Sequence, residues 1–286
     1  MERRVRSMSG HDSNSDFGDG CPRALVVTAP GINCDGELAR AFAEAGARPE
    51  QILFERLRRE PSLVDDFDLI GLPGGFSYGD DAGAGRILAQ LIRKDLYPAL
   101  AAAISRGVPM IAPCNGFQIA VQAGLLPGPD LGADWPPEPA APIVALAPNS
   151  AGRFRDDWTK VEIPADTRCI WTAGLSDVDS SVRLLPSAHG EGRLVADPSI
   201  IEGLDQEGRI AVRYAEGENF NGSTAAIAGI CDASGLVLGL MPHPERYTRW
   251  SQHPTWTRLP PAIRSEDPLG LLMFRNAVRH AMATSA

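Results

Sequence analysis

The chain has 286 residues, of which 44% are hydrophobic and 22% charged, a balance typical of a globular protein with a sizeable core. Its formal net charge of −9 provides no basic surface for a phosphate backbone, so we expect no nucleic-acid partner. No stretch approaches the ~20 apolar residues of a membrane helix, and no apolar signal segment follows the N-terminal arginines, so we expect no membrane contact and a cytoplasmic location.

The N-terminal segment, residues 1–22, is rich in Ser, Asp, Gly and Arg and poor in large apolar side chains. This composition predicts a disordered leader. We expect residues 23–286 to form a single domain.

Short apolar strands alternate with helices in the first half of this domain. We predict strands at 23–29, 51–55, 67–75 and 108–112, and helices at 34–47, in two stretches across 84–106, and from about 115 to 123. This alternation predicts an α/β fold with a mostly parallel central sheet and helices on both faces. Ligands of such folds gather at the carboxyl ends of the strands.

The second half has a different pattern. Residues 127–150 are rich in proline and small residues and predict an irregular insertion. Beyond it we predict a smaller antiparallel portion and a closing helix: strands around 157–163, 168–172 and 211–215, a hairpin at 224–245 with its turn at 232–235, and a helix near 269–283.

The cysteines are five in number and include no C-x-x-C pair: Cys21, Cys34, Cys114, Cys169 and Cys231. An odd total at irregular spacing fits neither a zinc knuckle nor a disulfide framework. We therefore predict free thiols and no bound metal.

Cys114 lies in "IAPCNGFQIA" (111–120), between an apolar strand and a predicted helix. The unpaired amides and positive dipole of a helix start stabilise a thiolate and favour a nucleophile there. Gly116 provides the small residue that a sharp turn needs, as in the G-x-S-x-G elbow, although Ala112 replaces its first glycine. The alternative is a buried, inert cysteine. We predict that Pro113 is tolerated because its missing N–H falls where the strand ends.

Two further segments supply what a nucleophilic thiol requires. "LPGGFSYGD" (72–80) places Gly74 and Gly75 at a strand end, where their amides can approach an oxyanion; the alternative is a simple turn. In "MPHPER" (241–246) the prolines favour extended backbone, so His243 and Glu245 project to the same side and Glu245 can orient the imidazole. Together these residues predict attack on an amide or ester carbonyl through a thioester.

A third segment, "AHGEGR" (188–193), carries His189 and Glu191. These side chains could contact substrate or a partner protein. A polar turn between strands explains the same residues.

These motifs, in this order, resemble those of the glutaminase subunits of phosphoribosylformylglycinamidine synthases, which are class I (triad) glutamine amidotransferases with a flavodoxin-like fold. The resemblance covers nearly all of the chain after residue 22, apart from the proline-rich insertion at 127–150. It implies that Cys114 forms a γ-glutamyl thioester, that His243 transfers the proton and that Glu245 orients His243.

The resemblance also implies binding residues. Gly74, Gly75, Phe76 and the backbone N–H of Asn115 match the oxyanion region, and Gln118 matches the glutamine pocket. "NSAGRF" (149–154) resembles a further segment near that pocket, which adds Arg153 and Phe154.

The partners that the resemblance implies are a synthetase subunit, which would receive the ammonia and hold ATP and Mg²⁺, and a small bridging subunit. No cofactor is expected in this chain. Two alternatives stay open: a free-standing γ-glutamyl or cysteine hydrolase, and a non-catalytic scaffold subunit that has kept the fold.

Overall fold

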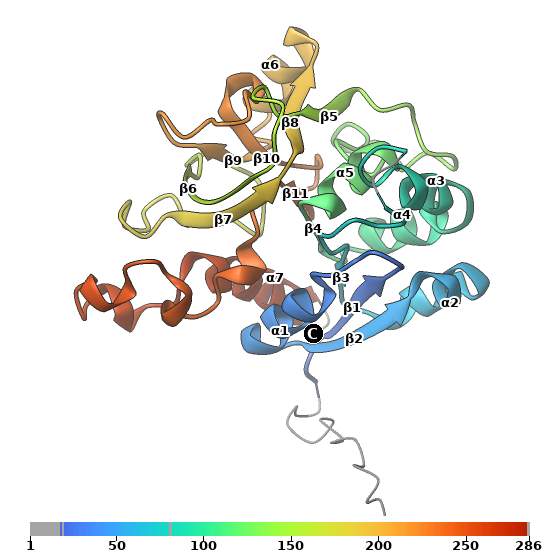
Figure 1. Ribbon diagram of the computed structural model, residues 1–286. Helices are drawn as coiled ribbons and strands as arrows, with labels where there is room; N and C mark the ends of the chain where they lie inside the picture. Colours follow the sequence, from blue (N-terminus) through green and yellow to red (C-terminus); the bar gives the residue numbers. More distant parts are fainter. Residues whose placement is uncertain (1–17, 19, 80–81, 285–286) are drawn as a thin grey trace, which may run out of the picture.

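A β-sheet forms the centre of the computed structural model, which describes residue 18 and residues 20–79 and 82–284 (Figure 1). The parallel part of the sheet runs in the spatial order β2 (Arg48–Leu53), β1 (Arg23–Thr28), β3 (Leu69–Gly71), β4 (Met110–Pro113) and β11 (Val237–Leu240). The sheet continues through antiparallel strands in the order β10 (Ile227–Cys231), β9 (Ile210–Tyr214), β6 (Arg155–Glu162) and β7 (Leu184–His189). β5 (Val144–Pro148) and β8 (Glu191–Ala196) form a separate antiparallel pair.

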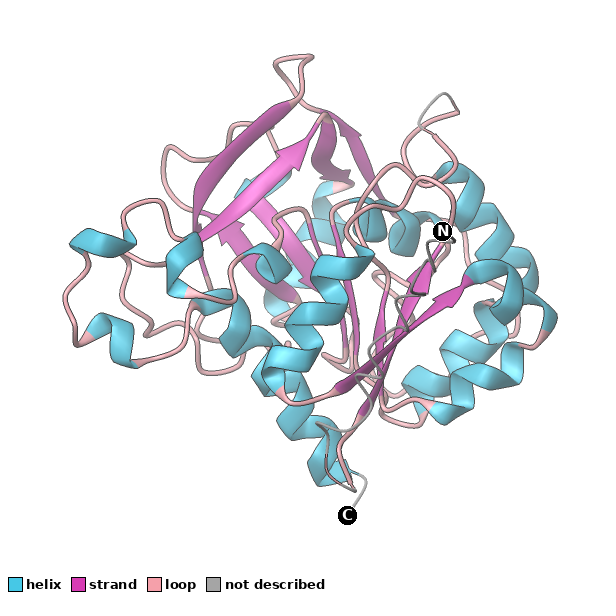
Figure 2. Ribbon diagram, turned by 60° about the horizontal axis from the view of Figure 1, so that its bottom comes forward, coloured by secondary structure: helices cyan, strands magenta, loops and turns pink. Residues whose placement is uncertain are grey.

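Helices cover both faces of the parallel strands (Figures 1 and 2). The helices are α1 (Asp35–Ala45), α2 (Phe54–Arg59), α3 (Arg86–Asp95), α4 (Tyr97–Ser105), α5 (Asn115–Gln122), α6 (Pro198–Gln206) and α7 (Leu269–Thr284). Successive side chains of β1 alternate between the two faces, as the period of a strand requires. Leu25 and Val27 belong to the core under α3, α4 and α5, while Ala24 and Val26 belong to the core under α1 and α7.

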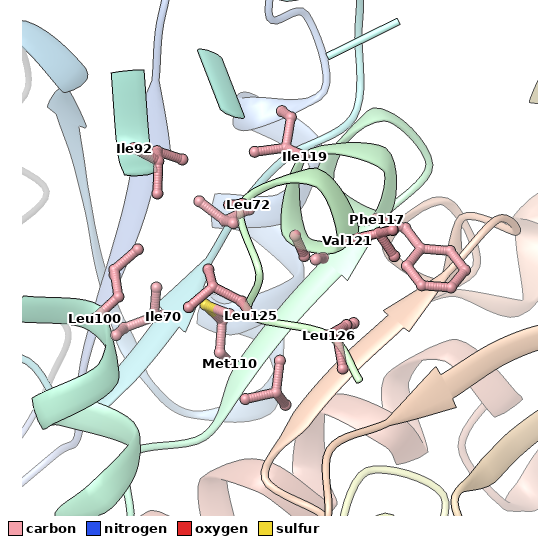
Figure 3. Close-up of a cluster of buried hydrophobic side chains, with 14 of the residues drawn as sticks. Ile70, Leu72, Ile92, Leu100, Met110, Phe117, Ile119, Val121, Leu125 and Leu126 are labelled. Carbon is pink, nitrogen blue, oxygen red and sulfur yellow. The ribbon is translucent and has the colours of Figure 1, made fainter. Parts of the chain in front are cut away.

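The core on the α3–α5 side packs around the end of β4 (Figure 3). Met110 from β4, Ile70 from β3 and Phe117 from α5 are fully buried in it. Burial of such large apolar side chains stabilises a fold by ~2 kcal/mol each. This packing fixes the strand end from which Cys114 projects.

The predicted α/β architecture with a smaller antiparallel portion is confirmed, and so is the hairpin formed by β10 and β11. All five cysteines lie in the described ranges and are free thiols, as predicted. Within those ranges, no helix combines the length and apolarity that a bilayer crossing requires.

Several predicted segments differ from the structure. The strand predicted at 67–75 is shorter, because only Leu69–Gly71 forms β3. The strand predicted at 51–55 begins earlier, at Arg48, and ends at Leu53, because Phe54 starts α2. Residues 168–172 form no strand in the described chain; Trp171 is buried there by core packing and donates its indole N–H to the Leu236 carbonyl. The predicted irregular insertion contains β5, which pairs with β8.

The predicted leader falls largely on residues 1–17 and 19, which lie outside the described residues. The assignment of residues 23–286 to a single domain stays a prediction.

The turn from β4 into α5 is sharp. Cys114 has φ 52° and ψ −111°, a conformation that side chains with a Cβ rarely adopt. Its amide donates to the Leu240 carbonyl of β11 at 2.7 Å. A methyl group on Gly116 would overlap the Leu72 carbonyl oxygen, so this turn requires glycine there.

Pro113 is the last residue of β4, as predicted. The backbone N–H groups of successive residues in β4 point alternately toward its two neighbouring strands, and the Cys114 N–H points toward β11. The missing N–H of Pro113 therefore faces β3, where the ladder has ended at the Gly71–Ile111 pair. The proline removes no hydrogen bond from the β4–β11 ladder.

We expect Gly116→Ala to lower the free energy of unfolding by about 2 kcal/mol, because its methyl group must displace the Leu72 backbone. Urea denaturation measures the effect. Gly203→Ala is the matched control, since Gly203 lies inside α6 with open space around it and alanine should stabilise that helix by about 0.5 kcal/mol. Equal unfolding free energies for the Gly116 variant and the wild type would contradict this account of the turn.

Candidate active site

Cys114 and His243 leave the carboxyl ends of two adjacent strands. β4 and β11 are parallel, and their last residues, Pro113 and Leu240, are in register. Both side chains are buried, with 6% of Cys114 and 1% of His243 exposed. The Cys114 thiol lies 3.6 Å from the Ala188 carbonyl oxygen of β7, which closes the site from a third strand.

Glu245 contacts the imidazole of His243. The distance between His243 Nδ1 and Glu245 Oε1 is 2.6 Å, and both side chains are buried. The predicted extended geometry is wrong, because Pro244–Arg246 forms a turn of 3₁₀ helix that begins after His243. The predicted contact forms nevertheless, because the turn brings Glu245 back toward the ring.

The environment of His243 favours its charged form. Burial by itself lowers the pKa of the imidazole, but the charge of Glu245 and the interaction with Cys114 outweigh burial and raise the pKa to about 10. His243 therefore carries a proton at neutral pH.

Gly74 separates Cys114 from the opposite wall of the site. A methyl group on Gly74 would lie 2.9 Å from His243 Cε1, so a side chain there would push against the ring, and it would touch Cys114 Cβ at 3.4 Å. Gly75 has φ 135°, a conformation that favours glycine. The strand-end glycines thus let the backbone approach the thiol.

The predicted oxyanion donors differ in availability. The Phe76 amide donates to the Gly31 carbonyl at 2.9 Å, so it is occupied. Among the described residues, the Gly75 amide donates to no acceptor, and the Asn115 amide is at the start of α5, where a helix provides none. Gly75 and Asn115 are therefore the candidate donors, and Phe76 contributes its half-exposed ring.

A cavity of about 280 Å³ opens in front of these residues. It brings together most of the predicted site: Gly75, Phe76, Cys114, Gln118, Phe154, His189, Glu191 and His243. Arg153 does not line this cavity; it borders a smaller one beside Asn149 and Phe220.

Hydrogen bonds connect the floor of the cavity to its walls. The Asn115 side chain accepts from the Ser77 hydroxyl at 2.8 Å and donates to Gln118 Oε1 at 2.9 Å. The Gln118 amide nitrogen in turn donates to the Glu191 carbonyl. Gln118 is thereby oriented from both sides.

Several cavity residues were missed from the sequence: Asn33, Cys34, Asp156 and Arg246. Arg246 directly follows the predicted Glu245 in "MPHPER", and this position could have indicated that it lies at the cavity. Cys34 precedes α1 without any local signature of function.

Cys34 provides the one further thiol of this cavity among the described residues. Burial, followed by the charge of Glu245, raises the pKa of the Cys34 thiol to about 12, so it stays protonated. Its sulfur accepts from Arg246 Nη2 at 3.1 Å, and Arg246 also donates to Glu37.

Cys34, His243 and Glu245 place potential ligand atoms within 4.8 Å of one another. The His243–Glu245 hydrogen bond and the guanidinium beside Cys34 already engage these atoms. The prediction that the chain binds no metal stays a prediction.

Residues 21–281 match the model of the CobB/CobQ-like glutamine amidotransferase domain. The chain is 38% identical over 266 residues to the phosphoribosylformylglycinamidine synthase subunit PurQ of Dehalococcoides mccartyi, which covers 91% of this chain and 97% of the relative. It is 34% identical over 278 residues to the subunit of the same name from Methanococcus maripaludis, with coverage of 91% and 97%.

Solved structures share the fold. The structure of PurLQS from Thermotoga maritima matches with a TM-score of 0.63 and 30% identity, over 91% of this chain and 98% of the other. A Thermoplasma acidophilum protein assigned to GMP synthase matches with a TM-score of 0.52 and 15% identity, over 92% and 95% of the two chains, which shows a shared fold alone.

We expect Glu245→Gln to lower the pKa of His243 from about 10, because burial then acts on the ring without the opposing carboxylate. The imidazole signals, followed by NMR across a pH titration, report the midpoint. His253, whose ring packs against Trp158, Tyr247 and Trp250, serves as internal reference. A His243 midpoint that does not fall in the variant would show that Glu245 does not hold the proton on the ring.

Proposed function

The chain belongs to the CobB/CobQ-like glutamine amidotransferase family and, within it, to the PurQ subunits of phosphoribosylformylglycinamidine synthase, and from this membership we propose that its Cys114 site hydrolyses glutamine to glutamate and ammonia. The observation that carries this assignment of residues is the strained turn that presents Cys114 to the buried His243–Glu245 pair. The ammonia serves the synthesis of formylglycinamidine ribonucleotide in purine biosynthesis.

The first step is attack of the Cys114 sulfur, as a thiolate paired with the charged His243 ring, on the γ-carbonyl carbon of glutamine. The carbonyl oxygen then carries negative charge, which the amides of Gly75 and Asn115 stabilise. The second of these amides benefits from the positive end of the α5 dipole. The tetrahedral species collapses with breakage of the C–N bond.

His243 supplies the proton for the departing nitrogen, since its raised pKa keeps the ring charged at neutral pH. Ammonia leaves, and a γ-glutamyl thioester stays on Cys114. The ring, now neutral, takes a proton from water as the water oxygen attacks the thioester carbonyl. The C–S bond then breaks, glutamate is released, and the Cys114 sulfur leaves as the thiolate beside the recharged ring. Glu245 holds the ring in place through both steps.

The glutamine side chain enters the cavity beside Gln118, whose amide is oriented by Asn115 and the Glu191 carbonyl. Phe154 lies at the border of this cavity and is 53% exposed. We assign Gln118 and Phe154 to substrate binding.

The partner is a synthetase subunit, an assignment supported by the match to the PurLQS complex of Thermotoga maritima. We further propose a small bridging subunit, ATP and Mg²⁺ on the synthetase, no cofactor in this chain, and a cytoplasmic location. Hydrolysis and ammonia use then occur in separate chains of one complex.

We expect Cys114→Ala to lower the rate of glutamine-dependent product formation by the complex about 10³-fold or more, because the thioester cannot form. Glutamate release and ribonucleotide amidination are measured in the same samples. Added ammonium chloride should restore amidination, since the synthetase receives ammonia directly.

Cys21→Ser is the matched control, because Cys21 lies outside the cavity at the start of the described fold. It should leave both activities at the wild-type level. Undiminished glutamate release by Cys114→Ala would exclude Cys114 as the nucleophile, and glutamate release by the isolated chain equal to that of the complex would favour a free-standing hydrolase.

A further inference from the structure

Two sequence segments without an assigned chemical step, "NSAGRF" and "AHGEGR", meet at one side chain. Asn149 Nδ2 donates to the His189 carbonyl at 2.8 Å and to the Arg153 carbonyl at 3.1 Å. The backbone N–H of Asn149 also donates to the Gly190 carbonyl at 2.8 Å. Asn149 thus clamps the connection between β7 and β8.

This clamp determines which nitrogen of His189 carries the proton. Because Asn149 Nδ2 donates to two carbonyl groups, its Oδ1 is the atom that faces His189 Nδ1, at 3.1 Å. Oδ1 can only accept, so Nδ1 carries the hydrogen. In the neutral ring, Nε2 is then left with a free lone pair.

Two contacts fix the position of the His189 ring. The Nδ1–Cε1 edge of the ring lies against Asn149 and Gly192, so close that a methyl group added to Gly192 would overlap the ring. One face packs on Phe220, with ring centroids 5.1 Å apart. His189 lines the cavity, and within the described chain Nε2 is buried and has no hydrogen-bond partner.

The ring stays neutral beside a charged neighbour. Burial, followed by the charge of His243, lowers the pKa of His189 to about 3. Nε2 is therefore an acceptor over the whole neutral pH range. A buried acceptor without a donor is rare in folded proteins. Because His189 lines the active-site cavity, a ligand bound in that cavity is the available donor.

We propose that His189 Nε2 accepts a hydrogen bond from a nitrogen of glutamine, either the α-ammonium group of the bound substrate or the ammonia that leaves it. Both are N–H donors, and both arise in this cavity if the proposed function holds. His189 is thus a substrate-contacting residue that adds selectivity for a nitrogen.

His189→Phe tests the proposal in the assembled complex, because phenylalanine preserves the ring volume and the contact with Phe220 but removes both nitrogens. A lost hydrogen bond to a charged group corresponds to a roughly tenfold or larger effect. If the α-ammonium group is the donor, KM for glutamine rises by that factor, while kcat/KM for 4-carbamoylbutanoate, which lacks the α-amino group, is unchanged. If ammonia is the donor, glutamate release is unchanged and less ammonia reaches product per glutamate.

His253→Phe is the matched control. His253 is also buried with an unpartnered Nε2 in the described residues, but it lies outside the cavity, among aromatic rings. His253→Phe should leave two quantities at wild-type values: the preference for glutamine over 4-carbamoylbutanoate and the ammonia transferred to product per glutamate released. Iodoacetamide labelling of Cys114, which needs no α-amino group, checks that the site of each variant is intact.

The proposal is overturned if His189→Phe labels normally and changes neither the preference for glutamine over 4-carbamoylbutanoate nor the ammonia transferred per glutamate. A wild-type complex that releases no glutamate would instead overturn the proposed function itself. The two failures are therefore distinguishable.

Discussion

The backbone of Cys114 is the constraint on which the rest of the site depends. A residue with a Cβ occupies φ 52° there at a cost of about 1–3 kcal/mol, so its surroundings must hold it in place. They do so through the hydrogen bond to Leu240, the close contact of Gly116 with the Leu72 carbonyl, and the buried side chain of Phe117. Core packing thus stabilises the backbone conformation that places the Cys114 thiol at the cavity.

The same strand pair positions His243. Because Pro113 and Leu240 are in register at the ends of β4 and β11, the chain segments that follow them diverge from the sheet at the same edge. His243 follows β11 closely, and its amide donates to the Pro186 carbonyl of β7. Residues far apart in the sequence therefore reach one point through strand register, without a long loop.

Local patterns were sufficient to predict the strand–helix junction at Cys114 and the strand-end position of Gly74 and Gly75. They predicted the contact between His243 and Glu245 from an extended geometry that the chain does not adopt. The same patterns failed for residues 168–172, because burial in a turn and burial in a strand select the same apolar side chains. The patterns also missed Cys34, and the oxyanion role that the resemblance implied for Phe76 did not anticipate that its amide is occupied. The hydrogen bond to Gly31 and the approach of Arg246 to Cys34 are tertiary contacts, and no spacing within a single segment encodes them.

The two histidines of the cavity show how one contact geometry gives two chemical behaviours. Each ring is held through Nδ1 by a side-chain oxygen, Glu245 Oε1 for His243 and Asn149 Oδ1 for His189. Burial opposes charge on both rings. At His243 the Glu245 carboxylate, together with Cys114, outweighs burial, whereas at His189 the charge of His243 adds to it. The amide holds the second ring without stabilising a second proton. The two proposed roles, protonation of a leaving nitrogen by His243 and recognition of a nitrogen by His189, call for one charged and one neutral imidazole, and the carboxylate or amide behind each ring contributes to that difference.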